Sequence, residues 1–144
     1  MEMDEEFLET NDLDWFASCQ DGLLAHFATG GRGFVPMTVR ESISVYESVY
    51  DYFFSIEDSV AVEVIYENLP VFSDDIQRER YLKSFVDMAR RGVLSYDVGG
   101  GGGYNLIARP RESRVVDSLP LVVKRNIPIL PLNFSLKIDV NDLL

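Results

Sequence analysis

The sequence predicts an α+β fold, a mostly antiparallel sheet built from hairpins with two main helices packed on it. Paired apolar runs flank turn-forming residues in 13–29 and again in 93–110. Apolar side chains recur at helical spacing in 38–54 and in 73–92. The length of 144 residues and the 47% hydrophobic content suit one domain with one core, so residues 1–144 are expected to form a single unit.

The N-terminal part predicts an acidic segment followed by a hairpin. Residues 1–11 are polar and acidic, and we expect them to be loosely ordered. The runs LDWFASC (13–19) and LLAHFAT (23–29) have the apolar density of strands. The dipeptide Asp21-Gly22 between them predicts a tight turn, because glycine adopts turn conformations without a steric penalty.

Residues 38–54 predict the first main helix. One face of it is apolar and comprises Val39, Ile43, Tyr46, Tyr50 and Phe53. Thr38 and Glu41 have the spacing of a capping box, in which each side chain accepts a hydrogen bond from the other residue's backbone amide. This pattern predicts that the helix begins at Thr38.

The middle of the chain predicts a strand and the second main helix. Residues 59–67 alternate apolar and polar side chains, which favours a strand, although so short a run is also compatible with a helix. In 73–92, Ser73 is the expected N-cap and Gly92 the expected end. The expected buried stripe of this helix is Leu82, Phe85, Val86 and Ala89.

The C-terminal part predicts a second hairpin and a closing strand. VLSYDV and YNLIARP flank five consecutive glycines, residues 99–103. Residues 117–127 predict a short helix capped by Asp117 or Ser118. Residues 132–140 alternate in polarity and predict the last strand.

Charge is strongly segregated along the chain. The net charge is −11, yet residues 1–75 contain 17 acidic and two basic side chains, and residues 76–144 contain 7 acidic and 11 basic ones. An acidic surface repels nucleic acid and anionic lipid and attracts basic proteins. The sequence therefore predicts a basic protein partner, with no nucleic acid and no membrane, for a chain that is a monomer or a homodimer.

The composition points to a cytoplasmic protein. With a single cysteine, Cys19, no internal disulfide can form, which is typical of a reducing compartment. The start MEMDEEFLET has neither the basic residues nor the apolar stretch of a secretory signal. No apolar run approaches the roughly 18 residues that a membrane-spanning helix needs.

The glycine-rich stretch AHFATGGRGFVP (25–36) raises the question of a phosphate-binding loop. The dinucleotide fingerprint requires a third glycine where Pro36 stands, and a Walker loop requires Gly-Lys-Ser/Thr. We therefore interpret 30–33 as a structural loop, with Arg32 at its tip available to a partner. The five glycines of 99–103 are interpreted as a mobile hairpin loop.

No motif predicts catalysis, a cofactor or a metal ion. His26 is the only histidine and is expected to be buried or half-buried in a strand, and Cys19 is expected to be a small core residue. The pairs Asp12 and Asp14, or Asp74 and Asp75, are more typical of caps and solvated edges than of acid–base pairs. The signatures G-x-S-x-G, H-E-x-x-H and C-x-x-C are absent.

Acidic residues are the leading candidates for partner binding. Residues 41–67 contain seven acids and no base, and these form either a solvated face or a docking surface. Trp15, Phe16 and the tyrosines of 46–52 are expected mainly in the core, with a recognition patch as the alternative. The candidate contact residues are Arg32, Glu41, Glu47, Asp51, Glu63 and Glu67.

Two segments resemble a group of small bacterial proteins. The stretch DWFASCQDGLLAHFATGGRGFVP (14–36) is similar to their N-terminal hairpin, with D-W-F, a D-G turn, A-x-F and G-G-x-G-x-x-P. VLSYDV with YNLIARP (93–110) is similar to their later hairpin. Some of these proteins are thought to be immunity proteins of bacterial toxin systems. The resemblance implies a stoichiometric binder and identifies neither a toxin nor any contact residue.

The sequence thus predicts a non-enzymatic protein-binding module, an immunity-type inhibitor that neutralises a basic toxin or effector. Toxins that act on nucleic acid are often basic, because they bind phosphate. One alternative is a small-molecule-binding or hydrolytic domain with a pocket near loops 30–33 and 99–103. Another is a structural subunit that self-associates through an exposed sheet edge.

Overall fold

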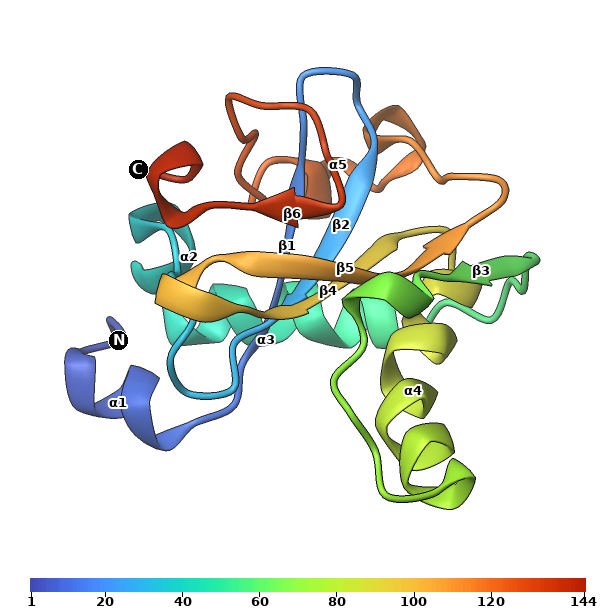
Figure 1. Cartoon of the computed structure of the whole chain (residues 1–144). Helices are drawn as coiled ribbons and strands as arrows, with labels where there is room; N and C mark the ends of the chain where they lie inside the picture. The colour runs from blue at the N-terminus through green and yellow to red at the C-terminus, as the bar shows by residue number, and fades with distance from the viewer.

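The computed structural model describes all residues, 1–144, and shows the predicted α+β fold (Figure 1). A six-stranded, mostly antiparallel sheet has the order β1-β2-β4-β5-β3, and β6 pairs with β5. The strands are β1 (Asp14–Ser18), β2 (Leu24–Ala28), β3 (Val62–Val64), β4 (Leu94–Val98), β5 (Tyr104–Pro110) and β6 (Lys137–Ile138). The two main helices, α3 (Ile43–Phe54) and α4 (Asp75–Arg90), pack on it.

Both predicted hairpins are confirmed. β1 and β2 pair antiparallel with Trp15 opposite Phe27, and Gly22 in their turn has φ +79°. β4 and β5 pair antiparallel across the glycine loop 99–103. The hairpins join through β2 and β4, which form the only parallel ladder among the six strands.

The first main helix is interrupted, and the predicted capping box is wrong. Helix α2 (Met37–Arg40) has Pro36 as N-cap without a side-chain cap bond, and α3 restarts at Ile43. The hydroxyl of Ser42 accepts from the Val45 amide and so caps α3. Val49 and Phe53 form the buried face of α3, while Tyr46 and Tyr50 are half-buried at its side.

Helix α4 is confirmed with a corrected cap. The N-cap is Asp74, whose carboxylate accepts from the Gln77 amide, and Ser73 instead donates to the side-chain oxygen of Gln77. Asp74 is suited to the position because a carboxylate also interacts favourably with the helix dipole. The buried stripe is Phe85, Met88 and Ala89, with Leu82 and Val86 half-buried beside it.

Two predicted strands and one predicted short helix are shorter in the structure than the sequence indicates. The strand predicted in 59–67 covers only Val62–Val64, followed by a 3₁₀ turn at Tyr66–Asn68, and the strand predicted in 132–140 covers only Lys137–Ile138. The helix predicted from 117 is α5 (Leu121–Lys124), and Pro120 is its N-cap instead of Asp117 or Ser118.

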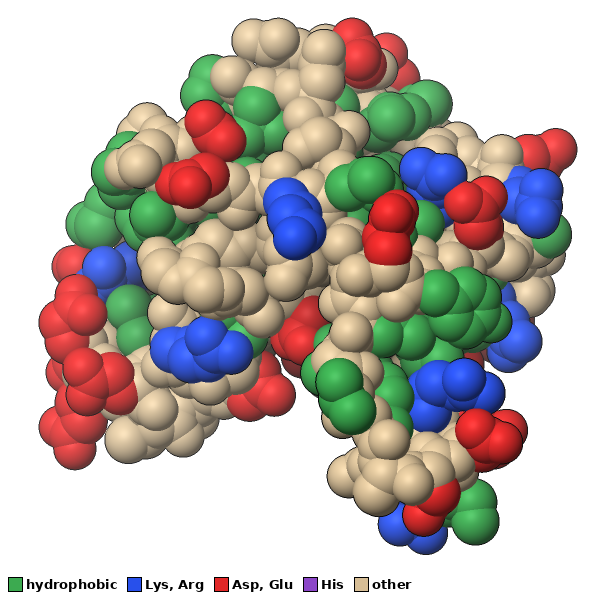
Figure 2. Space-filling view, viewed as in Figure 1, with side chains coloured by type: hydrophobic (Ala, Val, Ile, Leu, Met, Phe, Trp, Pro, Cys, Tyr) green, Lys and Arg blue, Asp and Glu red, His purple; other side chains and the backbone are tan.

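The acidic N-terminal residues contain helix α1 (Glu5–Thr10), which is capped by Asp4. Met3 is fully buried, and its amide donates to the Arg40 carbonyl. Figure 2 shows acidic side chains gathered over α1, whereas acidic and basic side chains alternate along α4. The N-terminal acids therefore form a defined part of the surface.

The sheet buries apolar side chains on both faces. Trp15, Phe27 and Tyr96 belong to one cluster, which Val35, Val39 and the C-terminal segment cover. Phe16 and Leu24 point to the other face, where residues of α3, α4 and α5 cover them. Neighbouring residues of one strand thus enter different clusters, as the period of two in a strand requires. No helix has the length and apolarity to cross a membrane.

Candidate functional site: an acidic pocket beside helix α3

A pocket of about 370 Å³ lies between the start of β1 and the side of α3. We call it the acidic pocket; its six lining residues are Asp12, Asp14, Tyr46, Glu47, Tyr50 and Asp51. Four of these are carboxylates and two are tyrosines, and no lysine or arginine is among them. The pocket therefore has a strongly negative potential with aromatic surface inside it.

Helix geometry aligns the aromatic side chains of the pocket. Tyr46, Tyr50 and Phe54 are spaced by four residues and therefore lie along one side of α3. The ring centroids of Tyr46 and Tyr50 are 6.2 Å apart, and Tyr50 stacks on Phe54 at 4.2 Å. The guanidinium carbon of Arg91 lies 5.4 Å from the Phe54 ring centroid. One end of this aromatic row thus already holds an arginine.

The two tyrosines are neutral over the physiological pH range. Burial raises the pKa of Tyr46 to about 12, although the Asp14 amide donates a hydrogen bond of 3.0 Å to its hydroxyl oxygen. Burial also raises the pKa of Tyr50, and the neighbouring Asp14 carboxylate adds to that effect. The negative charge of the pocket thus resides on the carboxylates, and the rings present uncharged π faces.

Asp14 connects the pocket to the core. Its carboxylate lies 2.6 Å from His26 Nε2, and His26 Nδ1 lies 2.8 Å from Ser95 Oγ. A neutral imidazole satisfies both contacts when Nε2–H donates to Asp14 and Nδ1 accepts from the serine hydroxyl. His26 is 2% exposed, which confirms the expectation of a buried histidine, and Ser95 is 0% exposed.

The Asp14–His26–Ser95 chain has the residue types of a hydrolytic triad but lacks an accessible nucleophile. With Ser95 enclosed between β2 and β5 in the sheet, no substrate carbonyl can approach its hydroxyl oxygen. The chain of hydrogen bonds instead orients the Asp14 carboxylate, whose side chain keeps 29% of its surface exposed. A preoriented carboxylate loses less entropy when it binds a cation.

The acidic residues do not form a metal centre. No group of three or more histidine, cysteine, aspartate or glutamate side chains is arranged to hold a metal ion. A larger organic cation is better matched to the pocket, because carboxylates at its edge and tyrosine rings inside it interact with a guanidinium or ammonium group together.

The structure brings only two of the predicted contact residues together. Glu47 and Asp51 line the acidic pocket, whereas Glu41 lines a different pocket near Arg125. Glu63 forms an ion pair of 2.7 Å with Arg109 across the β3–β5 ladder. Glu67 lies beside Ser135 and Lys137, in a further pocket.

Arg32 and the two glycine loops contact one another. The guanidinium of Arg32 donates to the Gly99 carbonyl at 3.0 Å, and the Phe34 amide donates to the Gly102 carbonyl at 3.0 Å. None of the five principal pockets is lined by a residue of 30–33 or 99–103. The loops therefore brace each other, and Arg32 serves in that contact.

Four residues of the acidic pocket are not among the contact residues that the sequence predicts, namely Asp12, Asp14, Tyr46 and Tyr50. The sequence favours caps or a solvated edge for Asp12 and Asp14, and mainly the core for Tyr46 and Tyr50. The Asp12 carboxylate does accept from the Gly30 amide at 2.8 Å, and Tyr46 does pack against the core. A signal existed for each pair, because Asp12 and Asp14 differ by two residues at a strand start and Tyr46 and Tyr50 by one helical turn. What no local pattern showed is that β1 begins next to this side of α3.

Comparisons of the chain with protein-family models, with curated proteins and with solved structures found no match.

Proposed function

We propose that this chain is a non-enzymatic protein-binding module, an immunity-type inhibitor that neutralises a basic toxin or effector. In this proposal the acidic pocket receives a basic side chain of the partner. The observation that carries the proposal is the convergence of four carboxylates around Tyr46 and Tyr50, with no basic residue in the lining. An unneutralised cluster of this kind gains most from a partner that supplies the missing positive charge.

Arginine is the side chain best suited to the pocket. Its planar guanidinium stacks on aromatic rings and donates two parallel hydrogen bonds to a carboxylate, which a lysine ammonium does not. The contact between Arg91 and Phe54 supports this choice, because the same aromatic row already holds a guanidinium at 5.4 Å. In the proposed complex, Tyr50 and Tyr46 provide the equivalent surface to the partner's arginine.

Long-range charge supports rapid association with such a partner. The net charge of −11 attracts a basic protein from beyond contact distance, and opposed charges raise association rates strongly at low ionic strength. A toxin that acts on nucleic acid carries a positive phosphate-binding cleft, and an acidic inhibitor competes for that cleft.

The test is capture of the partner from the native host, using the tagged protein with washes at low and high salt, and identification by mass spectrometry. We expect one basic protein that is retained at low salt and lost at high salt. Capture of no protein, or of a partner whose retention does not depend on salt, would contradict the proposal.

A matched pair of double variants then tests the pocket itself. Glu47→Gln with Asp51→Asn removes two charges inside the pocket, and Glu79→Gln with Glu112→Gln removes two from exposed residues that form no ion pair. We expect the first variant to weaken partner binding by roughly tenfold or more and the second to change it little. Equal effects would show that only net charge matters.

A further inference from the structure

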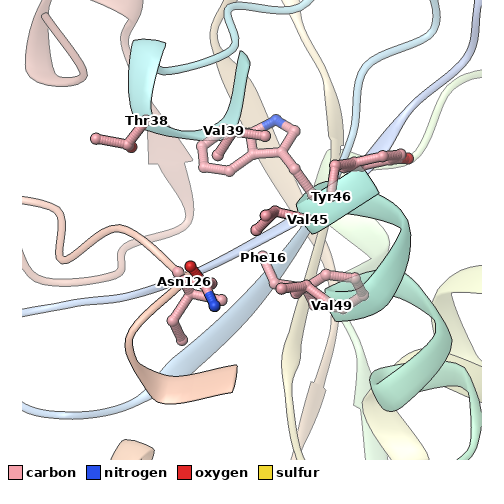
Figure 3. A pocket seen from close by; sticks show the side chains of 9 residues that line it. Phe16, Thr38, Val39, Val45, Tyr46, Val49 and Asn126 are labelled. Carbon is pink, nitrogen blue, oxygen red and sulfur yellow. The ribbon is translucent and has the colours of Figure 1, made fainter. Parts of the chain in front are cut away.

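A second pocket lies at the N-terminal end of α3 and shares only Tyr46 with the acidic pocket. It consists of an outer cavity of about 230 Å³ and an inner cavity of about 20 Å³. Both cavities are lined by Thr38, Val45, Asn126 and Ile127, so they adjoin, and we call the smaller, apolar one the inner cavity or floor. We call the whole the amphipathic pocket, and Figure 3 shows its inner part.

The floor of the amphipathic pocket is apolar. Side chains from β1, α2, α3 and the segment after α5 form it; they are Trp15, Phe16, Val39, Val49 and Ile127. In Figure 3 the side chains of Val45 and Val49 lie beside Phe16, while the Tyr46 hydroxyl points away from Asn126. A small apolar cavity of this kind favours an aliphatic group over water. Its volume of about 20 Å³ is enough for a methyl-sized group, such as the tip of a short branched side chain, and too small for a ring.

The rim of the same pocket carries two opposite charges. Glu41 and Arg125 both line the outer cavity, and both side chains are exposed. Neither side chain takes part in any ion pair or side-chain hydrogen bond. The Asn126 amide nitrogen donates to the Val122 carbonyl at 2.6 Å, which leaves its own carbonyl oxygen free to accept.

We propose that the amphipathic pocket binds a free α-amino acid with a small branched aliphatic side chain, such as valine or leucine. Two unpaired opposite charges over an apolar floor match a ligand that is a zwitterion at one end and aliphatic at the other. Arg125 binds the α-carboxylate, Glu41 and the Asn126 carbonyl oxygen bind the α-ammonium group, and the side chain enters the floor. This inference is independent of the proposed inhibitor function.

Titration calorimetry with L-valine and L-leucine tests the proposal on the intact protein. Isobutylamine and isovalerate serve as probes that keep the aliphatic group and lose one charge each. We expect saturable binding of at least one amino acid, with both single-charge probes weaker by about tenfold or more. No binding of either amino acid in the millimolar range, or equally tight binding of isobutylamine, would overturn the proposal.

Substitutions at the rim give a second test with matched controls. Arg125→Gln and Glu41→Gln are each expected to weaken amino-acid binding by about tenfold. Arg111→Gln and Glu112→Gln change exposed residues that line neither cavity and are expected to leave binding unchanged. Val45→Phe, which places a ring over the inner cavity, is expected to abolish binding while the far-ultraviolet spectrum stays native.

If Arg125→Gln and Arg111→Gln bind the amino acid equally well, the rim has no role in recognition and the proposal fails. That outcome would not affect the inhibitor proposal, because Glu47 and Asp51 line a separate pocket. Conversely, a protein that captures no partner but still binds the amino acid would contradict the inhibitor proposal and leave the amino-acid proposal intact.

Discussion

At the scale of single residues, His26 connects the core to the acidic pocket. It is the sole bridge between the buried hydroxyl of Ser95 and the half-exposed carboxylate of Asp14. A buried polar group that loses its partner destabilises the fold far more than an apolar pair of the same shape does. The histidine therefore matters for stability and for the orientation of Asp14, without any need for a catalytic role.

We expect His26→Leu to lower the free energy of unfolding by about 2–3 kcal/mol, because it leaves the Ser95 hydroxyl buried and unpaired. The double variant His26→Leu with Ser95→Ala removes that orphan group and should recover part of the loss. Denaturant unfolding measures both. A double variant that is less stable than the single one would contradict this account.

The buried carboxyl group of Asp97 predicts how the stability of the fold depends on pH. Burial raises the pKa of its carboxyl above the usual value of 3.8, although Tyr81 donates a hydrogen bond of 2.5 Å to it. Because the folded-state pKa is the higher one, the folded state binds the proton more tightly than the unfolded state does. This contribution to stability is complete below the unfolded-state pKa and is lost as pH rises through the folded-state pKa.

In Asp97→Asn this titration is absent, and the Asn carbonyl oxygen can still accept from Tyr81. We therefore expect the stability of the natural protein, measured relative to Asp97→Asn, to fall as pH increases from the acidic range toward neutrality. Urea unfolding at a series of pH values measures the difference. A difference that stays constant with pH, or rises, would show that Asp97 titrates with a pKa that folding does not raise.

Gly33 gives a steric prediction in the first glycine loop. A Cβ atom at this position would collide with the hydroxyl of Tyr104, whereas a Cβ atom at Gly100 would meet nothing within 4 Å. We expect Gly33→Ala to lower stability by about 1–3 kcal/mol and Gly100→Ala to be close to neutral. Thermal unfolding compares the two, and equal melting temperatures would refute the close packing of Gly33 against the Tyr104 ring.

At the scale of elements, the restart of the helix at Ser42 is the decisive feature. It ends α2 at Arg40 and begins α3 at Ile43, so that the apolar face expected in one continuous helix is divided between two short ones. Tyr46 and Tyr50 lie at the side of α3 and line the acidic pocket, and Tyr46 also packs against the core cluster that contains Trp15.

Two cap variants distinguish the interrupted helix, in which Ser42 caps α3, from one continuous helix that is capped at Thr38. Ser42→Ala should lower stability by about 1 kcal/mol, because the Val45 amide loses its acceptor. Thr38→Ala should have almost no effect, since no side chain caps α2. If Thr38→Ala were the more damaging change, the continuous helix with a Thr38–Glu41 capping box would be correct.

At the scale of the whole molecule, one sheet contributes side chains to all three apolar clusters. Trp15 and Phe16 are neighbours in β1 yet belong to different clusters. Loss of packing on either face therefore disturbs the same strands. A single sheet shared by all the apolar clusters predicts that the chain unfolds in one cooperative step.

We expect calorimetry to show one transition, and we expect Phe27→Ala and Phe16→Ala each to lower stability by about 3–5 kcal/mol. Both side chains are almost fully buried and stack on another ring, Trp15 for Phe27 and Phe53 for Phe16. Two separate transitions, or a variant that unfolds one face alone, would show that the clusters are independent.

The sequence by itself determined the fold class, both hairpins and the existence of the two main helices, because these depend on periodicity and turn chemistry within short stretches. It also indicated the acidic character of the surface, including Glu47 and Asp51. Helix ends were less predictable, since Ser42 and Asp74 compete with Thr38 and Ser73 as caps of similar quality.

Only the tertiary structure decided which acids share a pocket. Asp12 and Asp14 lie more than thirty residues before Glu47 and Asp51 in the chain, and they meet because β1 starts against the side of α3. The same holds for Glu41 and Arg125 at the amphipathic pocket. Contacts between distant segments depend on how strands and helices pack together, and no pattern within a single element contains that information.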